Sequence, residues 1–415
     1  MRALRFTALA SLVALLVACG GNGAPTSASN GATGPVSNTQ PIIVSGGPTG
    51  EFANMMTTSV TICVPGTGAC QTIPDVQVDT GSTGLRLLAS AVTLALPAVA
   101  GSGGNYSECA TFADGFVWGP LASADVQLAG EVAPSMSIQL IQDNGVGPAI
   151  PATCASQGTA EDGLTALGAN GILGIGTFLQ DCGPYCALNI SPYFYTCTSG
   201  GTCTEAAISL ALQPSNPAGF FAQDNNGVVL QLPAVAATGA TSANGTMLFG
   251  IGTQTNNMLS TAAIGVPASG AGAGSFTAVY NGNTYANSFF DSGSAALYFD
   301  DSSIPTCPAS TLSSLYCPGT AASLSATPIS VALTGSNGAT ATASLTLANA
   351  QFLLTQANAS TLNAFSNLGG PTATTLTNAF DFGVPSFFGN SVFTAFEQST
   401  TPAGNGPYFA FQPYP

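Results

Sequence analysis

Basic residues are almost missing from this chain. Of its 415 residues, 3 are Lys or Arg and none is His, against 18 Asp or Glu, so the formal net charge is −15. Charged residues make up 5% of the chain, compared with about 25% in an average soluble domain. A chain with so few cations has little with which to neutralise phosphates, so we expect no nucleic-acid partner.

The absence of His and Lys excludes several kinds of site. Ser-His-Asp and Cys-His catalytic sites need His, and so do His-rich zinc sites. Without Lys, neither a Schiff base nor the Lys of a phosphate-binding loop is available. The groups that remain for acid–base catalysis at mild pH are carboxylates, Tyr and Cys. Carboxylates are therefore the first candidates for a catalytic site.

The N-terminal residues have the pattern of an export signal followed by a linker. A short basic segment precedes the mostly apolar residues 6–17, which have signal-peptide length and are too short for a membrane span. The stretch ends at Cys19 in a pattern that resembles the bacterial lipobox, whose cysteine is lipidated; a plain signal peptide with an incidental cysteine is the alternative. Residues 1–18 are predicted to be a lipoprotein signal peptide, and residues 19–40 a flexible tether.

This pattern predicts an exported protein, a lipoprotein of the bacterial outer membrane or cell surface. The lipid anchor would be its only contact with the membrane, because no later segment has the sustained apolar length of a span.

The cysteines that remain after Cys19 are even in number, which is typical of disulfides in an oxidising compartment. Short spacing favours the pairs Cys63–Cys70 and Cys307–Cys317, and Cys109–Cys154 is a further candidate. Four cysteines allow three pairings or, as an alternative, a zinc site. These four are Cys182, Cys186, Cys197 and Cys203.

Short strands dominate the chain from about residue 40. Apolar and β-branched runs such as residues 228–232 are separated by Gly, Pro and Asn-Gly turns. Helical periodicity is best in residues 205–212 and 357–368. The class is therefore mainly β. The chain is too long for one core, so we expect an N-terminal lobe over residues 41–225 and a C-terminal lobe over 226–415.

One motif occurs twice in the same context. Asp79-Thr80-Gly81-Ser82 and Asp291-Ser292-Gly293-Ser294 each follow an apolar strand that is preceded by a predicted hairpin. Each is followed, at nearly the same distance, by an apolar-apolar-Gly element, residues 172–174 and residues 387–389. Two copies in matching order indicate an internal duplication.

The doublet predicts a specific chemistry. Two such loops, face to face, place the carboxylates of Asp79 and Asp291 around one water molecule. Like charges at that distance do not both ionise, so the pair shares a proton. The ionised member can then take a proton from water while the protonated member polarises a carbonyl. A turn-forming Asp after each strand, without chemistry, is the alternative.

The two loops resemble the active-site loops of pepsin-like aspartic proteases. The resemblance implies two pseudo-symmetric, β-barrel-like lobes with a central cleft, and Asp79 and Asp291 as the catalytic pair. It also implies that residues 170–176 and 385–397 are the apolar-Gly elements of the two lobes. The other motif residues are expected to support the loops. The hydroxyls of Thr80 and Ser292 would lock the turns, and those of Ser82 and Ser294 would orient the carboxylates. Gly81 and Gly293 would let a second backbone approach closely.

The chain departs from this family at the flap, a hairpin whose Tyr bonds a Trp that follows the first loop. The resemblance places the flap over residues 111–115, with Phe112 at the Tyr position and Arg86 at the Trp position. The usual flap hydrogen bond therefore cannot form. Arg86 is interpreted as an ion-pair partner or a substrate-carboxylate anchor. The single Trp, Trp118, fits either the core or the cleft.

The predicted function is that of an aspartic endopeptidase, exported, lipid-anchored and monomeric. It would hydrolyse a peptide or protein substrate without a cofactor and without a metal. The alternative is a catalytically inactive, protease-like surface lipoprotein that binds peptides or glycans in the same cleft.

Overall fold

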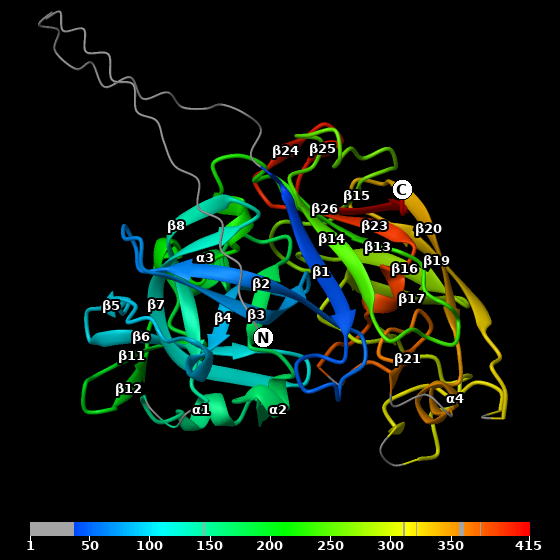
Figure 1. The fold of residues 1–415 in the computed structure, drawn as a ribbon, viewed down its shortest axis with the longest axis horizontal. Coiled ribbons are helices and arrows are strands. Elements are labelled where there is room, and N and C mark those ends of the chain that lie inside the picture. The colour runs from blue at the N-terminus through cyan, green and yellow to red at the C-terminus, as the bar shows by residue number, and fades with distance from the viewer. Residues whose placement is uncertain are drawn as a thin grey trace, which may run out of the picture. The chain divides into compact units, whose positions relative to one another are not determined.

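Strands make up most of the regular structure in the computed structural model, with 42% strand and 9% helix (Figure 1). The mainly β class predicted above is therefore confirmed. The predicted signal peptide and Cys19 lie outside the described residues. The structure describes residues 37–415 except 144, 146, 310, 311, 321, 357–360 and 374.

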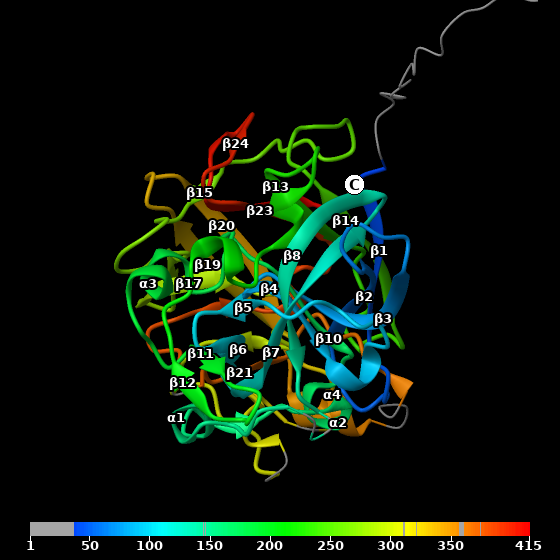
Figure 2. The ribbon, with the colours of Figure 1, turned by 90° about the vertical axis from the view of Figure 1, so that its left-hand side faces the viewer.

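The first lobe is built from antiparallel hairpins that fold over one another (Figure 2). The hairpin β2–β3 pairs with β7, and β7 continues into the hairpins β6–β7 and β7–β8. Alternate residues along these strands are apolar and buried, which fits strands that cover a core. The strands of this lobe are β2 (Met55–Cys63), β3 (Cys70–Asp79), β4 (Thr83–Leu88), β5 (Ala100–Gly101), β6 (Gly104–Thr111), β7 (Gly115–Leu128), β8 (Glu131–Ile141), β9 (Thr159–Ala160), β10 (Gly171–Ile175), β11 (Phe194–Cys197) and β12 (Cys203–Glu205).

A central antiparallel array of strands joins segments that are far apart in sequence. Strand β1 pairs with β2 of the first lobe and with β14, so the start of the described chain lies beside strands of the second half. Strand β1 begins at Thr39, so the last two residues of the predicted tether belong to a strand. The strands are β1 (Thr39–Ser45), β13 (Gly227–Leu232), β14 (Ala243–Phe249), β15 (Ile264–Gly265), β23 (Asn390–Ala395) and β26 (Tyr408–Pro413).

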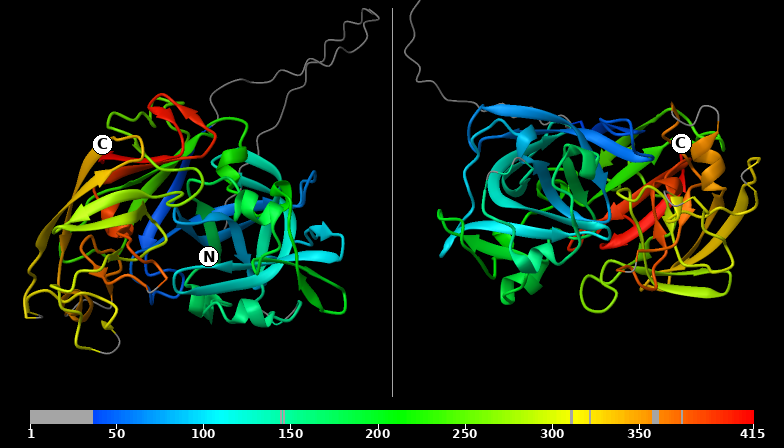
Figure 3. Two further views of the ribbon diagram at one scale, coloured as in Figure 1. Left: turned by 180° about the vertical axis from the view of Figure 1, so that it is seen from behind. Right: turned by 90° about the horizontal axis from the view of Figure 1, so that it is seen from below.

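The second lobe, drawn in yellow to orange, lies beside the first when seen from below (Figure 3). Its sheet runs in the order β20-β19-β16-β17-β22-β18-β21. A separate two-stranded ribbon is formed by β24 (Thr400–Thr401) and β25 (Gly404–Asn405). The sheet strands are β16 (Phe276–Tyr280), β17 (Asn283–Phe290), β18 (Leu297–Tyr298), β19 (Thr327–Thr334), β20 (Thr340–Leu347), β21 (Gly369–Gly370) and β22 (Asp381–Phe382).

The two lobes repeat one strand arrangement. In the first lobe, β10 lies parallel to β3 and antiparallel to β4, with Gly174 opposite Asp79. In the second, β22 lies parallel to β17 and antiparallel to β18, with Phe382 opposite Phe290. Each candidate carboxylate therefore comes at the end of a strand that is paired on both sides, which holds the following loop in place.

Helices are short and do not lie where helical periodicity predicts them. Residues 205–212 form the end of β12 and a single 3-10 turn, Leu210–Leu212, so that prediction was wrong. In residues 361–368, the described part of the second segment, no α-helix is present. The α-helices are α1 (Ala152–Ala155), α2 (Leu164–Leu167), α3 (Gly183–Leu188) and α4 (Ala350–Thr355).

The core of the second lobe is a stack of aromatic rings beneath the second loop. Phe299 and Phe380 stack with ring centroids 4.4 Å apart, and Phe380 lies 4.4 Å from Phe382 in turn. Phe382 contacts Phe290, the residue before Asp291, at 5.0 Å. Such packed aromatic pairs bury large apolar areas and restrict the loop above them. None of the helices among the described residues is long and apolar enough to cross a bilayer.

Candidate active site

The first candidate carboxylate lies where β3 ends. Asp79 is the last residue of β3, and the next three residues turn the chain into β4. The backbone N–H of Gly81 donates to Oδ1 of Asp79 at 2.7 Å, and the Ser82 hydroxyl donates to Oδ2. These two donors, one on each oxygen, fix the plane of the carboxylate.

The second loop repeats this arrangement. Asp291 follows β17, the N–H of Gly293 donates to its Oδ1 at 2.7 Å, and the Ser294 hydroxyl lies 2.9 Å from its Oδ2. Both loops therefore give their carboxylates the same two contacts, and the contact with the Ser hydroxyl is the one that the repeated motif predicts.

The hydroxyl residues that follow each Asp join one loop to the other. The Thr80 hydroxyl donates to the carbonyl of Phe290 at 3.0 Å, and the Ser292 hydroxyl donates to the carbonyl of Val78 at 2.7 Å. Each hydroxyl oxygen also accepts the backbone N–H of its counterpart, at 2.9 and 3.1 Å. We expected these hydroxyls to lock their own turns; they hold the two loops together instead.

Only glycine fits beside the opposing carboxylate. A Cβ atom at Gly81 would lie 2.7 Å from the carboxyl carbon of Asp291, and one at Gly293 would lie 2.7 Å from Oδ1 of Asp79. Each carboxylate therefore packs against the backbone of the other loop. Burial, and then the charges of Asp79 and Asp381, raise the pKa of Asp291 well above its ordinary value. The structure thus brings the carboxyl groups of Asp79 and Asp291 together, each against the glycine of the opposite loop.

The glycine element of the second lobe is not where the sequence predicts it. The register of β22 against β17 makes residues 381–383 the counterpart of residues 172–174 in the first lobe. Residues 387–389 come after this element and lead into β23, so their assignment was wrong. The spacing of the apolar-apolar-Gly signal was misleading because Asp381 interrupts the apolar run at the true position.

Asp381 is a site residue that sequence reasoning missed. It is 1% exposed, and its Oδ2 lies 2.6 Å from the Ser294 hydroxyl, the same group that contacts Asp291. Burial raises the pKa of Asp381 to about 8, although the contact with Ser294 opposes this shift. A carboxylate in an otherwise apolar run is the sequence signal that could have revealed it.

A cavity of about 510 Å³ opens beside the first loop, with Thr80, Gly81 and Ser82 in its lining. This volume is typical of a ligand pocket. All the residues that line it are uncharged, and they come from both lobes; they include Thr83, Phe178, Gly274, Asn287 and Leu376.

The predicted flap is the turn between β6 and β7. The N–H of Phe112 donates to the carbonyl of Gly115 at 2.8 Å, which closes the hairpin. The tip reaches the other lobe, because the Thr375 hydroxyl donates to the carbonyl of Ala113 at 3.1 Å. The Phe112 ring lies 5.9 Å from the guanidinium carbon of Arg86. A cation–ring contact therefore joins the two positions that were predicted for the flap and its partner.

Arg86 is an internal ion-pair partner. It is buried, its guanidinium lies 3.0 Å from Oε1 of Glu108, and it also pairs with Asp181. Its Nη1 also donates to the Thr83 carbonyl at 2.7 Å, which ties it to the start of β4. With these partners Arg86 is not free to anchor a substrate carboxylate.

Trp118 belongs to the core of the first lobe. It is buried, packs edge-on against Tyr195 at 5.3 Å, and donates from Nε1 to the carbonyl of Pro148 at 3.0 Å.

Ten cysteines form five disulfides. The pairs Cys63–Cys70, Cys109–Cys154 and Cys307–Cys317 form as expected. The four remaining cysteines pair as Cys182–Cys186 and Cys197–Cys203, so the zinc alternative was wrong.

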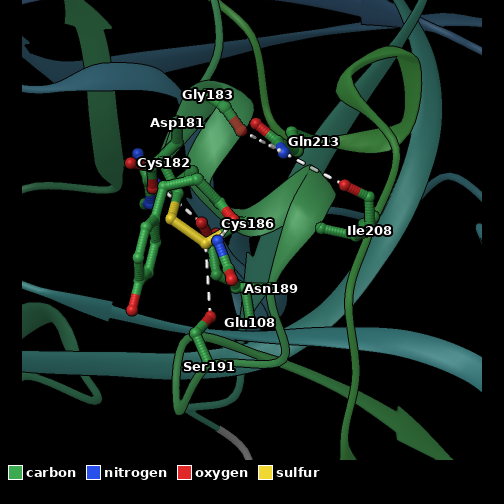
Figure 4. Close-up of a disulfide and its surroundings, with 11 residues drawn as sticks. Glu108, Asp181, Cys182, Gly183, Cys186, Asn189, Ser191, Ile208 and Gln213 are labelled. Atoms are coloured by element: carbon green, nitrogen blue, oxygen red, sulfur yellow. Dashed lines mark hydrogen bonds and ion pairs between the residues drawn. A yellow bond between two sulfur atoms is a disulfide. The ribbon is translucent and has the colours of Figure 1, made fainter. Parts of the chain in front are cut away.

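Figure 4 shows the Cys182–Cys186 disulfide at the start of α3, directly after Asp181. The Gln213 side chain holds this turn by donating to the carbonyls of Gly183 at 2.9 Å and Ile208 at 3.1 Å (Figure 4). Within the described part of the chain, no group of three or more His, Cys, Asp or Glu residues is arranged to hold a metal ion.

Together, the fold and the paired loops define a pepsin-like aspartic proteinase architecture. The chain is similar to the crystal structure of the aspartic proteinase from Irpex lacteus, with 14% sequence identity and a TM-score of 0.51 over 91% of this chain and 97% of that one. At this identity, the likeness shows the fold alone. Residues 34–411 match the family described as "Protein of unknown function (DUF3443)", so the chain belongs to that family. None of the curated proteins compared with it is significantly similar in sequence.

Proposed function

We propose that this protein is an aspartic endopeptidase. The observation that carries the proposal is the matched environment of Asp79 and Asp291. Each receives one backbone N–H and one Ser hydroxyl, each packs against the glycine of the opposite loop, and one of the two has a raised pKa. Two equivalent carboxyl groups, one of them with a raised pKa, suit general acid–base hydrolysis of an amide.

In the proposed mechanism, a water molecule between the two carboxyl groups attacks the peptide carbonyl carbon. The ionised carboxylate takes a proton from this water, and the protonated carboxyl group donates its proton to the carbonyl oxygen, so a neutral tetrahedral diol forms. The carboxyl group that took the water proton then gives it to the amide nitrogen as the C–N bond breaks. One diol hydroxyl gives its proton to the other carboxylate and becomes the carbonyl of the new carboxylic acid, so the dyad again holds one proton. Neither a metal ion nor a covalent intermediate takes part in these steps.

The uncharged cavity beside the first loop supports a peptide or protein substrate with uncharged side chains. The acidic chain, with 3 basic residues in total, disfavours nucleic-acid partners. No cofactor is needed, and we propose that the protein acts as a monomer, since both loops belong to one chain.

We also propose that the protein is exported and held on the bacterial outer membrane or cell surface by a lipid on Cys19. Five disulfides and the lack of a spanning helix among the described residues are compatible with export. If the proposal is correct, a Cys19→Ser variant is released from the membrane fraction while its disulfides still form. A Cys19→Ser variant that fractionates with membranes like the parent chain would contradict the anchor.

The activity is tested by incubating the full chain with an unfolded protein between pH 3 and 7. We expect cleavage that pepstatin blocks and that falls at least 1,000-fold in Asp79→Asn and in Asp291→Asn. Asp75→Asn, the same change on the same strand, serves as the matched control and should keep its activity. Cleavage that persists in both dyad variants would exclude the mechanism.

The alternative function, an inactive protease-like module that binds peptides or glycans, is supported by the altered flap. Phe112 has no hydroxyl and contacts Arg86 instead of a Trp, so the flap cannot position water or substrate in the family's way. This alternative predicts tight ligand binding without turnover, and binding that is unchanged in Asp79→Asn.

A further inference from the structure

Strand β22 places a third carboxyl group under the second loop. Asp381 lies opposite Phe289 on β17 and opposite Tyr298 on β18, and it is 1% exposed. The equivalent position in the first lobe is Ile172, a buried apolar side chain. The two halves of the site are therefore symmetric at the loops but not beneath them.

The hydrogen atoms around Ser294 can be counted. Its hydroxyl oxygen lies 2.9 Å from Oδ2 of Asp291 and 2.6 Å from Oδ2 of Asp381, yet a hydroxyl has a single hydrogen to donate. If Ser294 donates to Asp291, as Ser82 does to Asp79, then the contact with Asp381 needs a hydrogen from Asp381. That hydrogen exists only when Asp381 is protonated.

The surroundings of Asp381 also favour its neutral form. Its Oδ1 is buried and has no hydrogen-bond partner, which is far more costly for an ionised carboxylate than for a neutral carboxyl group. Within the described chain, the titratable groups that interact with it are Asp79, Asp291 and Tyr298, and none of them is a cation.

We propose that Asp381 is a positioning residue: as a protonated carboxyl group it donates to Ser294 and thereby directs the Ser294 hydrogen onto Asp291. The chain Asp381–Ser294–Asp291 distinguishes Asp291 from Asp79, because Ile172 cannot make the same contact in the first lobe. This inference rests on the proposed function only for its kinetic consequences. The protonation of Asp381 does not depend on whether the protein cleaves peptides.

The kinetic test compares two substitutions of Asp381 in the full chain. Asp381→Asn keeps a hydrogen donor towards Ser294, so its kcat between pH 3 and 5 should stay within about threefold of the parent. Asp381→Leu removes the donor, and its kcat should fall about tenfold or more with KM changed less than threefold. Equal damage in both variants, or none in Asp381→Leu, would overturn the proposal.

A double-variant cycle separates positioning from simple packing. If Asp381 acts through Ser294, the losses in Asp381→Leu and Ser294→Ala overlap, and the combined variant is little worse than Ser294→Ala alone. Independent losses that multiply would show that Asp381 contributes only by packing. Asp224→Asn, a change at a buried Asp outside the site, is the control for the substitution itself.

Infrared spectroscopy tests the proton without any activity. Other carboxyl groups with a raised pKa, such as Glu161, also absorb as protonated carboxyl groups, so the test uses a difference spectrum. At pH 6 the spectrum of the parent chain minus that of Asp381→Asn should contain a protonated-carboxyl C=O band, and the spectrum of the parent chain minus that of Asp224→Asn should not. If this difference band is missing for Asp381→Asn, the inference fails even when the protein cleaves peptides. If the difference band is present but no form of the chain cleaves any substrate, the proton is established and the proposed peptidase function fails instead.

Discussion

Arg86 is the only Lys or Arg among the residues that the structure describes, and it lies between two carboxylates in the first lobe. Burial lowers its pKa, but the charges of Glu108 and Asp181 more than offset this effect and raise it. Burial raises the pKa of Glu108 well above its ordinary value despite Arg86. A buried charge that loses its partner costs about 3–5 kcal/mol.

Replacing Arg86 by Met should therefore lower the free energy of unfolding by about 3 kcal/mol or more at pH 7. The loss should be smaller at pH 4, because the raised pKa of Glu108 makes this carboxyl group neutral there, and a neutral group needs no cation. Urea unfolding at both pH values measures this difference. The double variant Arg86→Met/Glu108→Gln should recover part of the loss at pH 7. An equal loss at both pH values would contradict the ion-pair role.

The glycines of the two loops give a second prediction at this scale. Gly81→Ala places a methyl group against the Asp291 carboxylate, where a Cβ would lie 2.7 Å from the carboxyl carbon. Since a displacement of about 1 Å in a catalytic group can cost about 100-fold, activity should fall by that factor or more. Gly68→Ala, where a Cβ meets nothing within 4 Å, is the control. Circular dichroism should show that both variants fold.

The role of Asp381 could not be predicted from single residues or short motifs. The loop residues could be predicted because the Asp-Thr/Ser-Gly-Ser motif carries its own hydrogen-bonding geometry. Asp381 acts only through the register of β22 against β17, and no local pattern sets that register. The apolar-apolar-Gly signal at residues 387–389 was a better local match and was nevertheless the wrong one.

Among the structural elements, helix α1 is held in place by a disulfide. Helix α1 has four residues, and a helix this short has little stability of its own. The Cys109–Cys154 disulfide joins it to β6 across a sequence separation of 45, whereas Cys197–Cys203 closes a separation of 6.

In the chain-entropy model, a disulfide that closes a longer loop removes more entropy from the unfolded chain and therefore stabilises the fold more. Removing Cys109–Cys154 by a double Ser substitution should lower the free energy of unfolding by about 4 kcal/mol, against about 2 kcal/mol for Cys197–Cys203. Urea unfolding of the two double variants measures the difference. Equal losses would mean that strain or residual structure, rather than loop length, decides the stabilisation.

Strand elements were easier to predict than helices, for a physical reason. The runs at residues 42–44, 76–78 and 228–232 all lie in strands, because turn residues on both sides bound them. The segment 205–212 has helical spacing of apolar residues, yet tertiary contacts divide it between a strand end and a single 3-10 turn. Periodicity over so few residues does not outweigh those contacts.

At the scale of the whole molecule, scarce charge and buried carboxyl groups point to stability in acid. Burial raises the pKa of Asp381 from 3.8 to about 8, and burial with the charge of Asp114 raises the pKa of Glu161 from 4.5 to about 8. A carboxyl group whose pKa is higher in the folded state stabilises the fold below its unfolded pKa, and this stabilisation is lost as pH rises through the folded pKa.

The free energy of unfolding should therefore be higher at pH 4 than at pH 8, with the decline spread between about pH 4 and pH 8. The absence of His and Lys removes groups that acid would newly charge on unfolding. Urea titrations across this range, with disulfides intact, measure the trend. Asp381→Asn should flatten it because the amide does not titrate. A protein that unfolds at pH 3–4 would contradict the prediction.

The sequence by itself determined the mainly β class, the paired loops and the two candidate carboxylates, because those features are written in local patterns that occur twice. It also excluded His, Lys and basic-patch chemistry by composition alone. Only the tertiary structure decided that Thr80 and Ser292 join the loops, that Arg86 is internally paired, how the last four cysteines pair, and that Asp381 lies under Ser294. Each of these depends on strand register and burial between segments far apart in the chain, which local sequence does not encode.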